Sequence, residues 1–183
     1  MKAIIFHGWG STSDDNWFPW LKKELEKKRF EVIVPDLPDS DYPKQKKWVA
    51  TAHKLTHYDE NTILVGHSLG TCLIMRLLET FDKKVKAIFL VSAFDKDLGI
   101  NEIEKFFYKR YNYEKIIKNA GKIYILNSDN DPYIPLNIAE QLSKKLKCKL
   151  TVFPNKEHLS AGTDNFKFPE LRDMILNETH TKN

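Results

Sequence analysis

The sequence predicts an α/β fold, in which helices cover both faces of a parallel sheet. Short runs rich in β-branched residues recur along the 183-residue chain, and longer segments with helical periodicity separate them. Strands that alternate with helices are joined by right-handed crossovers, which places the strands parallel to one another in a single sheet. The expected strands cover residues 2–6, 31–34, 62–65, 85–91, 122–126 and 149–153.

The helices are predicted from apolar stripes and from the positions of prolines. The first is expected from a stripe of Trp17, Trp20, Leu21 and Leu25, with Ser13 as its N-cap and Asp14 and Asp15 in its first turn. A second stripe comprises Trp48, Ala52 and Leu55. An aromatic and charged segment at 101–119 follows the fourth strand. Helices at 135–146 and 169–176 each begin with a proline, whose missing N–H is harmless at that position.

The chain is expected to form one domain over residues 1–183, with a frayed tail from about residue 177. Its length suffices for one substantial core, and no glycine-serine-rich or proline-rich stretch indicates a boundary between domains. The net charge is +4, but the lysines are interspersed with acidic residues along the expected helices. That pattern is typical of a solvated surface, so we expect no nucleic-acid partner.

The start of the chain favours a cytoplasmic protein without a membrane partner. The first apolar run, at 2–6, is too short for a signal peptide, and no run reaches membrane-spanning length. The two cysteines, Cys72 and Cys148, lack the spacing of a metal site and are expected to be reduced. Neither a metal nor a cofactor is expected.

The segment Gly66-His67-Ser68-Leu69-Gly70 directly follows the third expected strand. In a sharp strand-to-helix turn the serine hydroxyl projects from the tip, and glycines two residues before and after it avoid collisions with neighbouring backbone. Ser68 is therefore a candidate nucleophile. An ordinary strand, turn and helix would produce the same pentapeptide, so a base and an acid are needed to support the catalytic interpretation.

The candidate base is His158, in the loop after the last expected strand. Two of the six histidines, His7 and His158, follow strands at the sheet edge where ligands bind in parallel α/β folds. His7 is tied to the glycine loop that follows the first strand. A mobile loop after the last strand can place an imidazole over the nucleophile, so His158 is preferred and His7 is the alternative.

The candidate acid is Asp131, in the sequence Asp129-Asn130-Asp131 after the fifth strand. Asp131 precedes two prolines that stiffen the loop, whereas Asp129 is expected to hold the turn or a backbone amide. The order serine, aspartate, histidine along the chain is that of α/β-hydrolases. An oxyanion hole is expected from the backbone N–H groups of Leu69 and Trp9, with Gly8 as the alternative to Trp9.

The chain resembles a family of small serine hydrolases typified by retinoblastoma-binding protein nine and by related bacterial proteins described as esterases. The resemblance spans nearly the whole chain and rests on residues 7–10, 35–39, 59–70, 90–93, 97–99, 128–135 and His158. It implies a compact α/β-hydrolase fold with strand order 2-1-3-4-5-6 and no extended lid. It also implies a triad of Ser68, Asp131 and His158.

Two departures from the family pattern matter. Glu157 stands where many relatives have a glycine before the histidine, which affects the local loop geometry. The Leu-x-Cys-x-Glu motif for retinoblastoma-type partners is absent, since residues 56–60 read Thr-His-Tyr-Asp-Glu, so such a partner is not expected.

The expected activity is hydrolysis of carboxylic esters or related acyl compounds, with a small molecule or a short acyl or peptidyl compound as substrate. The alternative is a protein-interaction module whose triad is vestigial. A minority of nine aromatic residues are expected to line the substrate pocket: Trp9, Trp17, Phe18, Phe94, Phe106, Phe107, Tyr108, Tyr111 and Tyr133.

Overall fold

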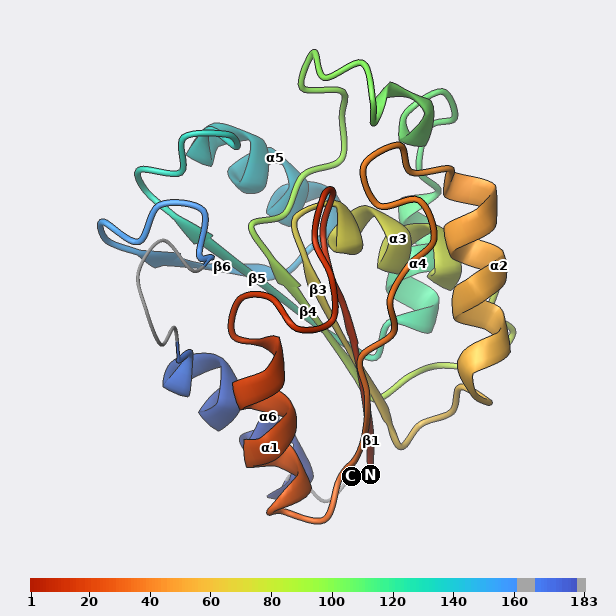
Figure 1. Cartoon of the computed structure of the whole chain (residues 1–183), viewed down its shortest axis with the longest axis vertical. Helices are drawn as coiled ribbons and strands as arrows, with labels where there is room; N and C mark the ends of the chain where they lie inside the picture. Colours follow the sequence, from red (N-terminus) through yellow and green to blue (C-terminus); the bar gives the residue numbers. More distant parts are fainter. Residues whose placement is uncertain (161–166, 181–183) are drawn as a thin grey trace.

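The computed structural model describes residues 1–160 and 167–180, which form a six-stranded parallel sheet (Figure 1). The order across the sheet is β2-β1-β3-β4-β5-β6, which confirms the predicted fold and strand order. The strands are β1 (Lys2–Phe6), β2 (Glu31–Ile33), β3 (Thr62–His67), β4 (Ala87–Val91), β5 (Lys122–Ser128) and β6 (Lys149–Phe153). All of their pairings are parallel.

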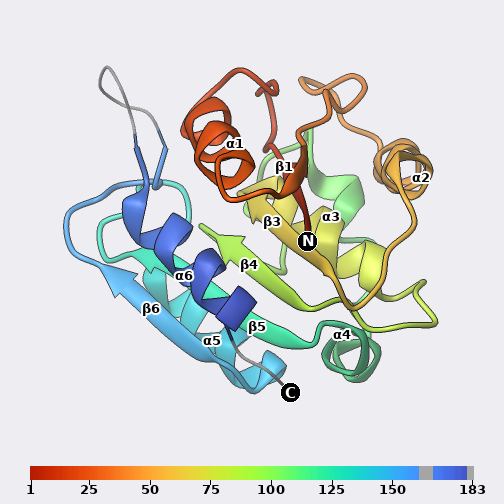
Figure 2. The same ribbon diagram turned by 90° about the horizontal axis from the view of Figure 1, so that it is seen from below.

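Helices cover both faces of the sheet, as Figures 1 and 2 show. The helices are α1 (Phe18–Glu26), α2 (Gln45–Leu55), α3 (Leu69–Leu78), α4 (Tyr113–Asn119), α5 (Leu136–Leu146) and α6 (Pro169–His180). The pair α1 and α6 packs on one face, and α2, α3, α4 and α5 pack on the other. A short 3-10 helix, η1 (Glu104–Phe106), lies in the connection from β4 to α4.

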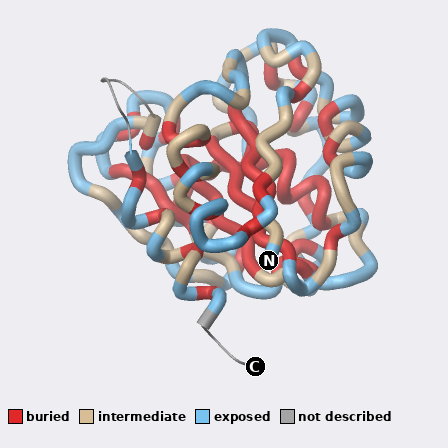
Figure 3. The backbone as a smooth tube through the Cα atoms, turned by 60° about the horizontal axis from the view of Figure 1, so that its bottom comes forward, coloured by how far each residue is buried: buried red, intermediate tan, exposed pale blue. Residues whose placement is uncertain are grey.

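Burial is greatest in the middle of the sheet (Figure 3). Every residue of β3 and β4 is buried, whereas the edge strands β2 and β6 are partly exposed. Two apolar cores lie between the sheet and its two helical layers. Strands covered on both faces need apolar residues throughout, which explains the uninterrupted runs in the sequence. The segment that contains Ser68 directly follows β3, one of these two fully buried strands.

Helix α1 begins at Phe18, so the predicted cap at Ser13 is wrong. The residue before the helix makes no side-chain cap hydrogen bond. The Ser13 N–H instead donates to Asp36 Oδ1 at 2.8 Å, and Asp15 Oδ2 accepts from the Thr12 N–H at 2.7 Å. Because these polar side chains bond to one another and to a distant loop, residues 12–15 form a turn outside the helix.

Helix α6 extends to His180, so the frayed tail predicted from residue 177 is wrong for residues 177–180. Glu178 is buried on this last turn. Its carboxylate accepts hydrogen bonds from Tyr124 OH at 2.5 Å and from Lys122 Nζ at 3.3 Å. Those bonds to β5 stabilise the end of the helix, while residues 181–183 lie outside the described part of the chain.

Candidate active site

Ser68 lies at the sharp turn between β3 and α3. Its backbone has φ 53° and ψ −121°, a combination that L-residues rarely adopt. The Ser68 N–H donates to Val91 O at 2.9 Å, which ties the turn to the end of β4. The structure therefore places Ser68 in the strand-to-helix turn that the sequence predicts.

Three glycines allow the backbone to approach this turn closely. A Cβ at Gly66 would lie 2.7 Å from the carbonyl carbon of Gly70, and a Cβ at Gly70 would overlap the carbonyl oxygen of Phe6. A Cβ at Gly8 would lie 3.0 Å from Ser68 Cβ. Side chains at these positions would push apart β1, β3 and α3, so glycine here has a steric role.

His158 and Asp131 form a hydrogen-bonded pair beside this turn. His158 Nδ1 lies 2.8 Å from Asp131 Oδ2. An ionised carboxylate can only accept, so Nδ1 carries the proton and the neutral imidazole keeps its Nε2 lone pair free for a proton. The Asp131 side chain is fully buried, and that of His158 is 13% exposed.

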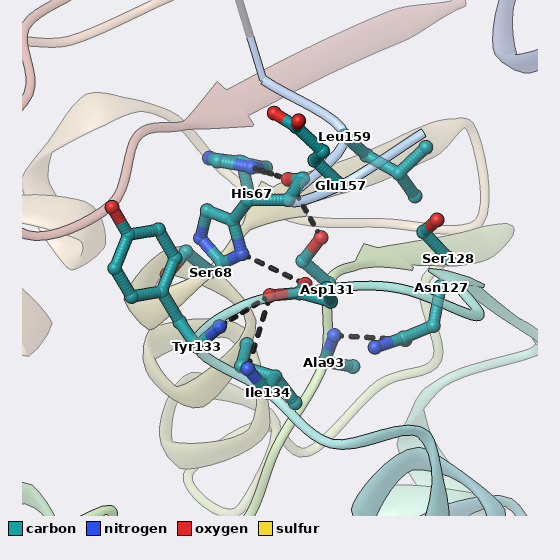
Figure 4. A network of polar contacts seen from close by, with 12 residues as sticks. His67, Ser68, Ala93, Asn127, Ser128, Asp131, Tyr133, Ile134, Glu157 and Leu159 are labelled. Carbon is teal, nitrogen blue, oxygen red and sulfur yellow. Dashed lines mark hydrogen bonds and ion pairs between the residues drawn. The ribbon is translucent and has the colours of Figure 1, made fainter. Parts of the chain in front are cut away.

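Two backbone groups hold Asp131 in place. The N–H groups of Tyr133 and Ile134 donate to Asp131 Oδ1 at 2.9 and 3.0 Å (Figure 4). Burial raises the pKa of the Asp131 carboxyl, but the bonds from His158 and from these two amides outweigh it, so the pKa lies below its usual value. Asp131 therefore stays charged and keeps its bond to the imidazole.

The loop that carries His158 is held by side chains that follow β5. Asp129 Oδ1 accepts from the Asn155 N–H at 2.8 Å, which confirms the prediction that Asp129 holds a backbone amide. Asn130 Oδ1 accepts from the Glu157 N–H at 2.8 Å. Three residues of this loop have left-handed backbone, with φ of 55° at Asn155, 47° at Glu157 and 47° at Leu159. A conformation this irregular depends on its hydrogen bonds.

His7, the alternative base, uses both ring nitrogens in structural hydrogen bonds. Its Nε2 accepts from the Leu37 N–H at 2.8 Å, so its Nδ1 donates to Gly8 O at 2.8 Å. Burial lowers the pKa of His7, and its side chain is shielded from solvent. His7 thus fixes the glycine loop beside Ser68 and has no free lone pair to offer a nucleophile.

The predicted oxyanion donors, Trp9 and Leu69, border the same space as Ser68. Among the hydrogen bonds of the described residues, none is donated by either backbone N–H. The Trp9 side chain is 42% exposed, and its indole N–H donates to Asp41 O at 2.8 Å. That bond joins the glycine loop to residues 39–42, so the second loop positions Trp9.

Ser68 and His158 line one cavity of about 340 Å³. Its other lining residues are mostly apolar: Trp9, Gly10, Asp41, Leu69, Phe94, Leu98, Ile100, Ile103, Tyr133 and Ile134. Of the nine aromatic candidates, Trp9, Phe94 and Tyr133 line this cavity. Ser68 Oγ makes no hydrogen bond within the described residues. A hydrogen bond between a catalytic hydroxyl and its base is often long or absent without substrate and shortens when substrate binds.

Arg76, which the sequence interpretation missed, anchors the segment that supplies part of this cavity. The side chain is 4% exposed and pairs with Glu79 at 3.1 Å. Its guanidinium donates to the carbonyl oxygens of Phe106, Lys109 and Arg110. The only sequence signal was an arginine inside an otherwise apolar helix. Such a residue must find buried acceptors, here in the connection from β4 to α4.

No group of three or more His, Cys, Asp or Glu side chains within residues 1–160 and 167–180 is arranged to hold a metal ion. Across the same residues, no helix combines the length and the apolar character needed to cross a membrane.

A family model with the description "Serine hydrolase" matches residues 3–177. The chain belongs to this serine hydrolase family. It is 32% identical over 180 residues to the serine hydrolase RBBP9 of Rattus norvegicus, an alignment that covers 95% of this chain and 93% of that protein. It is also 32% identical over 178 residues to YdeN of Bacillus subtilis, covering 95% and 94% of the two chains.

Solved structures agree with this membership. The crystal structure of the B. subtilis ydeN gene product superposes with a TM-score of 0.94 at 27% identity, covering 98% of this serine hydrolase and 99% of that chain. Est1E from Butyrivibrio proteoclasticus with bound ferulic acid has a TM-score of 0.77 at 17% identity, covering 98% and 90%. The second similarity concerns the fold alone.

Proposed function

We propose that this serine hydrolase cleaves carboxylic esters through an acyl-enzyme on Ser68. The observation that supports this most strongly is the convergence of three features on one cavity. Ser68 stands at a strained turn, His158 is hydrogen-bonded through Nδ1 to buried Asp131, and both Ser68 and His158 border the same apolar space. This arrangement of nucleophile, base and orienting carboxylate suits acyl transfer.

In the proposed acylation step, Ser68 Oγ attacks the substrate carbonyl carbon while its proton passes to His158 Nε2. The N–H groups of Trp9 and Leu69 donate to the oxyanion that forms. The ester C–O bond then breaks, and His158 returns the proton to the departing alcohol. Asp131 holds the imidazole in the required tautomer and stabilises its charged form.

Deacylation repeats the same steps with water. A water molecule gives one proton to His158 Nε2 as its oxygen attacks the acyl carbon. The bond between that carbon and Ser68 Oγ breaks, and Ser68 recovers a proton from His158. The products are a carboxylic acid and the regenerated enzyme, with no metal or cofactor among the groups that this route uses.

The cavity lining favours uncharged, apolar acyl groups. Phe94, Leu98, Ile100, Ile103 and Ile134 supply aliphatic and aromatic surface. Among the lining residues, Asp41 supplies a carboxylate, and none is a lysine or arginine. An anionic acyl group would therefore lose its hydration without gaining a positive partner.

The test is hydrolysis of an ester panel with graded acyl length, beside aminoacyl amides, by the wild-type protein and Ser68→Ala. We expect ester hydrolysis that is lost in the variant, and labelling of Ser68 by a fluorophosphonate. Intact activity in Ser68→Ala, or labelling of another residue, would contradict the proposal. Native protein that neither reacts with the probe nor hydrolyses esters would favour the vestigial interaction module.

The cytoplasm remains the proposed location, without nucleic-acid, membrane or retinoblastoma-type partners.

A further inference from the structure

The backbone oxygen of His158 accepts two side-chain hydrogen bonds from the centre of the sheet. His67 Nε2 lies 2.9 Å from this oxygen, and Ser92 Oγ lies 2.8 Å from it. His67 is the last residue of β3, and Ser92 directly follows β4, whose Val91 pairs with His67 in the register of the two strands. Two adjacent buried strands thus hold one atom of an irregular loop.

The direction of both bonds follows from their chemistry. A carbonyl oxygen only accepts, so His67 Nε2 carries a proton and donates it, and the Ser92 hydroxyl donates as well. Burial, together with repulsion from His158, lowers the pKa of His67 to about 3, so the ring is neutral at physiological pH. Its single N–H is fully committed to the His158 carbonyl.

The surroundings fix both donors. The His67 ring packs edge-on against Trp17, with ring centroids 6.0 Å apart, and lies 6.1 Å from the ring of Phe18. Ser92 is completely buried and has a left-handed backbone, with φ 50°. Such a conformation costs free energy in a non-glycine residue, and here it accompanies a hydroxyl directed at the His158 carbonyl.

The same donors act next to the reacting imidazole. The rings of His67 and His158 have centroids 4.9 Å apart at an interplanar angle of 64° (Figure 4 shows His67 in this network). The next carbonyl along the loop, that of Leu159, accepts from the indole N–H of Trp17 at 2.9 Å. The backbone that directly follows the His158 Cα is therefore held at two successive carbonyls.

We propose that His67 and Ser92 are positioning residues that orient the His158 imidazole for proton transfer by holding its backbone carbonyl. The inference rests on the proposed function, since it assigns both residues a task in that reaction. Neither residue borders the cavity, so we expect neither to contact substrate. Displacement of a catalytic group by a fraction of an ångström lowers turnover more than it lowers binding.

The experiment compares Ser92→Ala, His67→Phe and His67→Gln with the wild-type enzyme. Ser92→Ala removes one oxygen, His67→Phe keeps a ring without a donor, and His67→Gln restores an N–H donor. Thr62→Val is the matched control, because Thr62 is equally buried on β3 but bonds Asp59, away from the site.

The expected result is a fall in kcat of about tenfold for Ser92→Ala and for His67→Phe, with KM within about twofold, as loss of one hydrogen bond implies. His67→Gln should recover most of the loss, and Thr62→Val should keep the wild-type kcat. The fall should be larger for an alkyl ester than for a p-nitrophenyl ester, because only the alkyl alcohol needs a proton from His158 to leave.

A second readout does not depend on activity. The proton on His158 Nδ1, bonded to Asp131, should give a low-field NMR signal that broadens in Ser92→Ala and persists in Thr62→Val. Wild-type kcat and an unchanged signal in folded Ser92→Ala would overturn the inference, as would equal losses in Thr62→Val. Full activity in Ser68→Ala would instead refute the proposed function, so the two failures are distinguishable.

Discussion

The turn that carries Ser68 and the loop that carries His158 meet at one cavity but are built by opposite means. The turn joins two fully buried elements, and glycines let its backbone pack directly against β1. The loop has exposed residues and three left-handed backbones, and it is held by side chains that bond its amides and carbonyls. Steric fit therefore fixes the proposed nucleophile, whereas hydrogen bonding fixes the proposed base.

This difference explains why the two regions have different sequence signals. A steric constraint requires glycine at set spacings, and the resulting pattern lies within five consecutive residues. A loop held by hydrogen bonds draws its partners from β3, β4 and the segment after β5. Asn130 lies 27 residues before its partner Glu157 in the sequence, and Ser92 lies 66 residues before its partner His158. The first kind of site can be found by a local motif, and the second requires the fold.

The largest expected effect is on the orienting carboxylate of the loop. Asp131→Asn should fold normally but reduce kcat by about 10⁴-fold, because an amide no longer enforces the required tautomer of His158. Steady-state kinetics with an activated ester measures this fall in kcat. Asp129→Asn is the matched control, since an asparagine oxygen can still accept from the Asn155 N–H. A greater loss in the control would transfer the role to Asp129.

The next largest effect is expected from a steric clash in the turn that carries Ser68. Gly66→Ala places a Cβ against the Gly70 backbone, so the free energy of unfolding should fall by about 2–3 kcal/mol or more, or the variant should fail to fold. Urea denaturation gives the value. Gly99→Ala, where a Cβ meets no atom within 4 Å, should cost about 1 kcal/mol from its left-handed backbone alone. Equal costs at both positions would refute the steric account.

A pH titration of stability tests the buried donor at the end of β3. The pKa of His67 falls from 6.5 in the unfolded chain to about 3 in the fold, so between these values the unfolded chain binds more protons. Stability should therefore decrease as the pH falls from 6.5, by up to about 1.4 kcal/mol per pH unit.

Urea denaturation at pH 7, 6, 5 and 4 measures this slope. Buried His7, whose pKa is also lowered, adds to it in the same direction. Carboxyls whose pKa is lowered in the fold, Asp131 and Glu24 among them, add to the slope below about pH 5, so the histidines dominate the slope between pH 7 and about 5. His67→Phe should flatten the slope, while Ser92→Ala, which removes no titratable group, should keep it. An unchanged slope in His67→Phe would mean that His67 is not held neutral.

The smallest effect concerns the strained residue before His158. Glu157→Gly relieves the left-handed backbone but adds entropy to the unfolded chain, so the free energy of unfolding should change by less than about 1 kcal/mol. Activity should stay within twofold of the wild type, since the Glu157 N–H that bonds Asn130 remains. A tenfold loss of activity would show that the Glu157 side chain has a role of its own.

The sequence was sufficient for the parallel sheet, its strand order through the family resemblance, and the turn at Ser68. It failed at Ser13, because a run of serine, threonine and aspartate before an apolar stripe fits a cap and a turn equally well, and only the contact with Asp36 decides. It also failed at the end of α6, where buried Glu178 bonds residues of β5 that are more than fifty positions away. Arg76, His67 and Ser92 were overlooked for the same reason, since their partners are set by the fold.

A double-mutant cycle on Ser68 and His158 tests most directly whether turn and loop form one catalytic unit. Ser68→Ala, His158→Ala and the double variant would be compared in kcat for an activated ester. Residues that act as a unit are strongly non-additive, so each single variant should lose nearly as much activity as the double variant. Independent losses that multiply in the double variant, or a fully active single variant, would contradict this account.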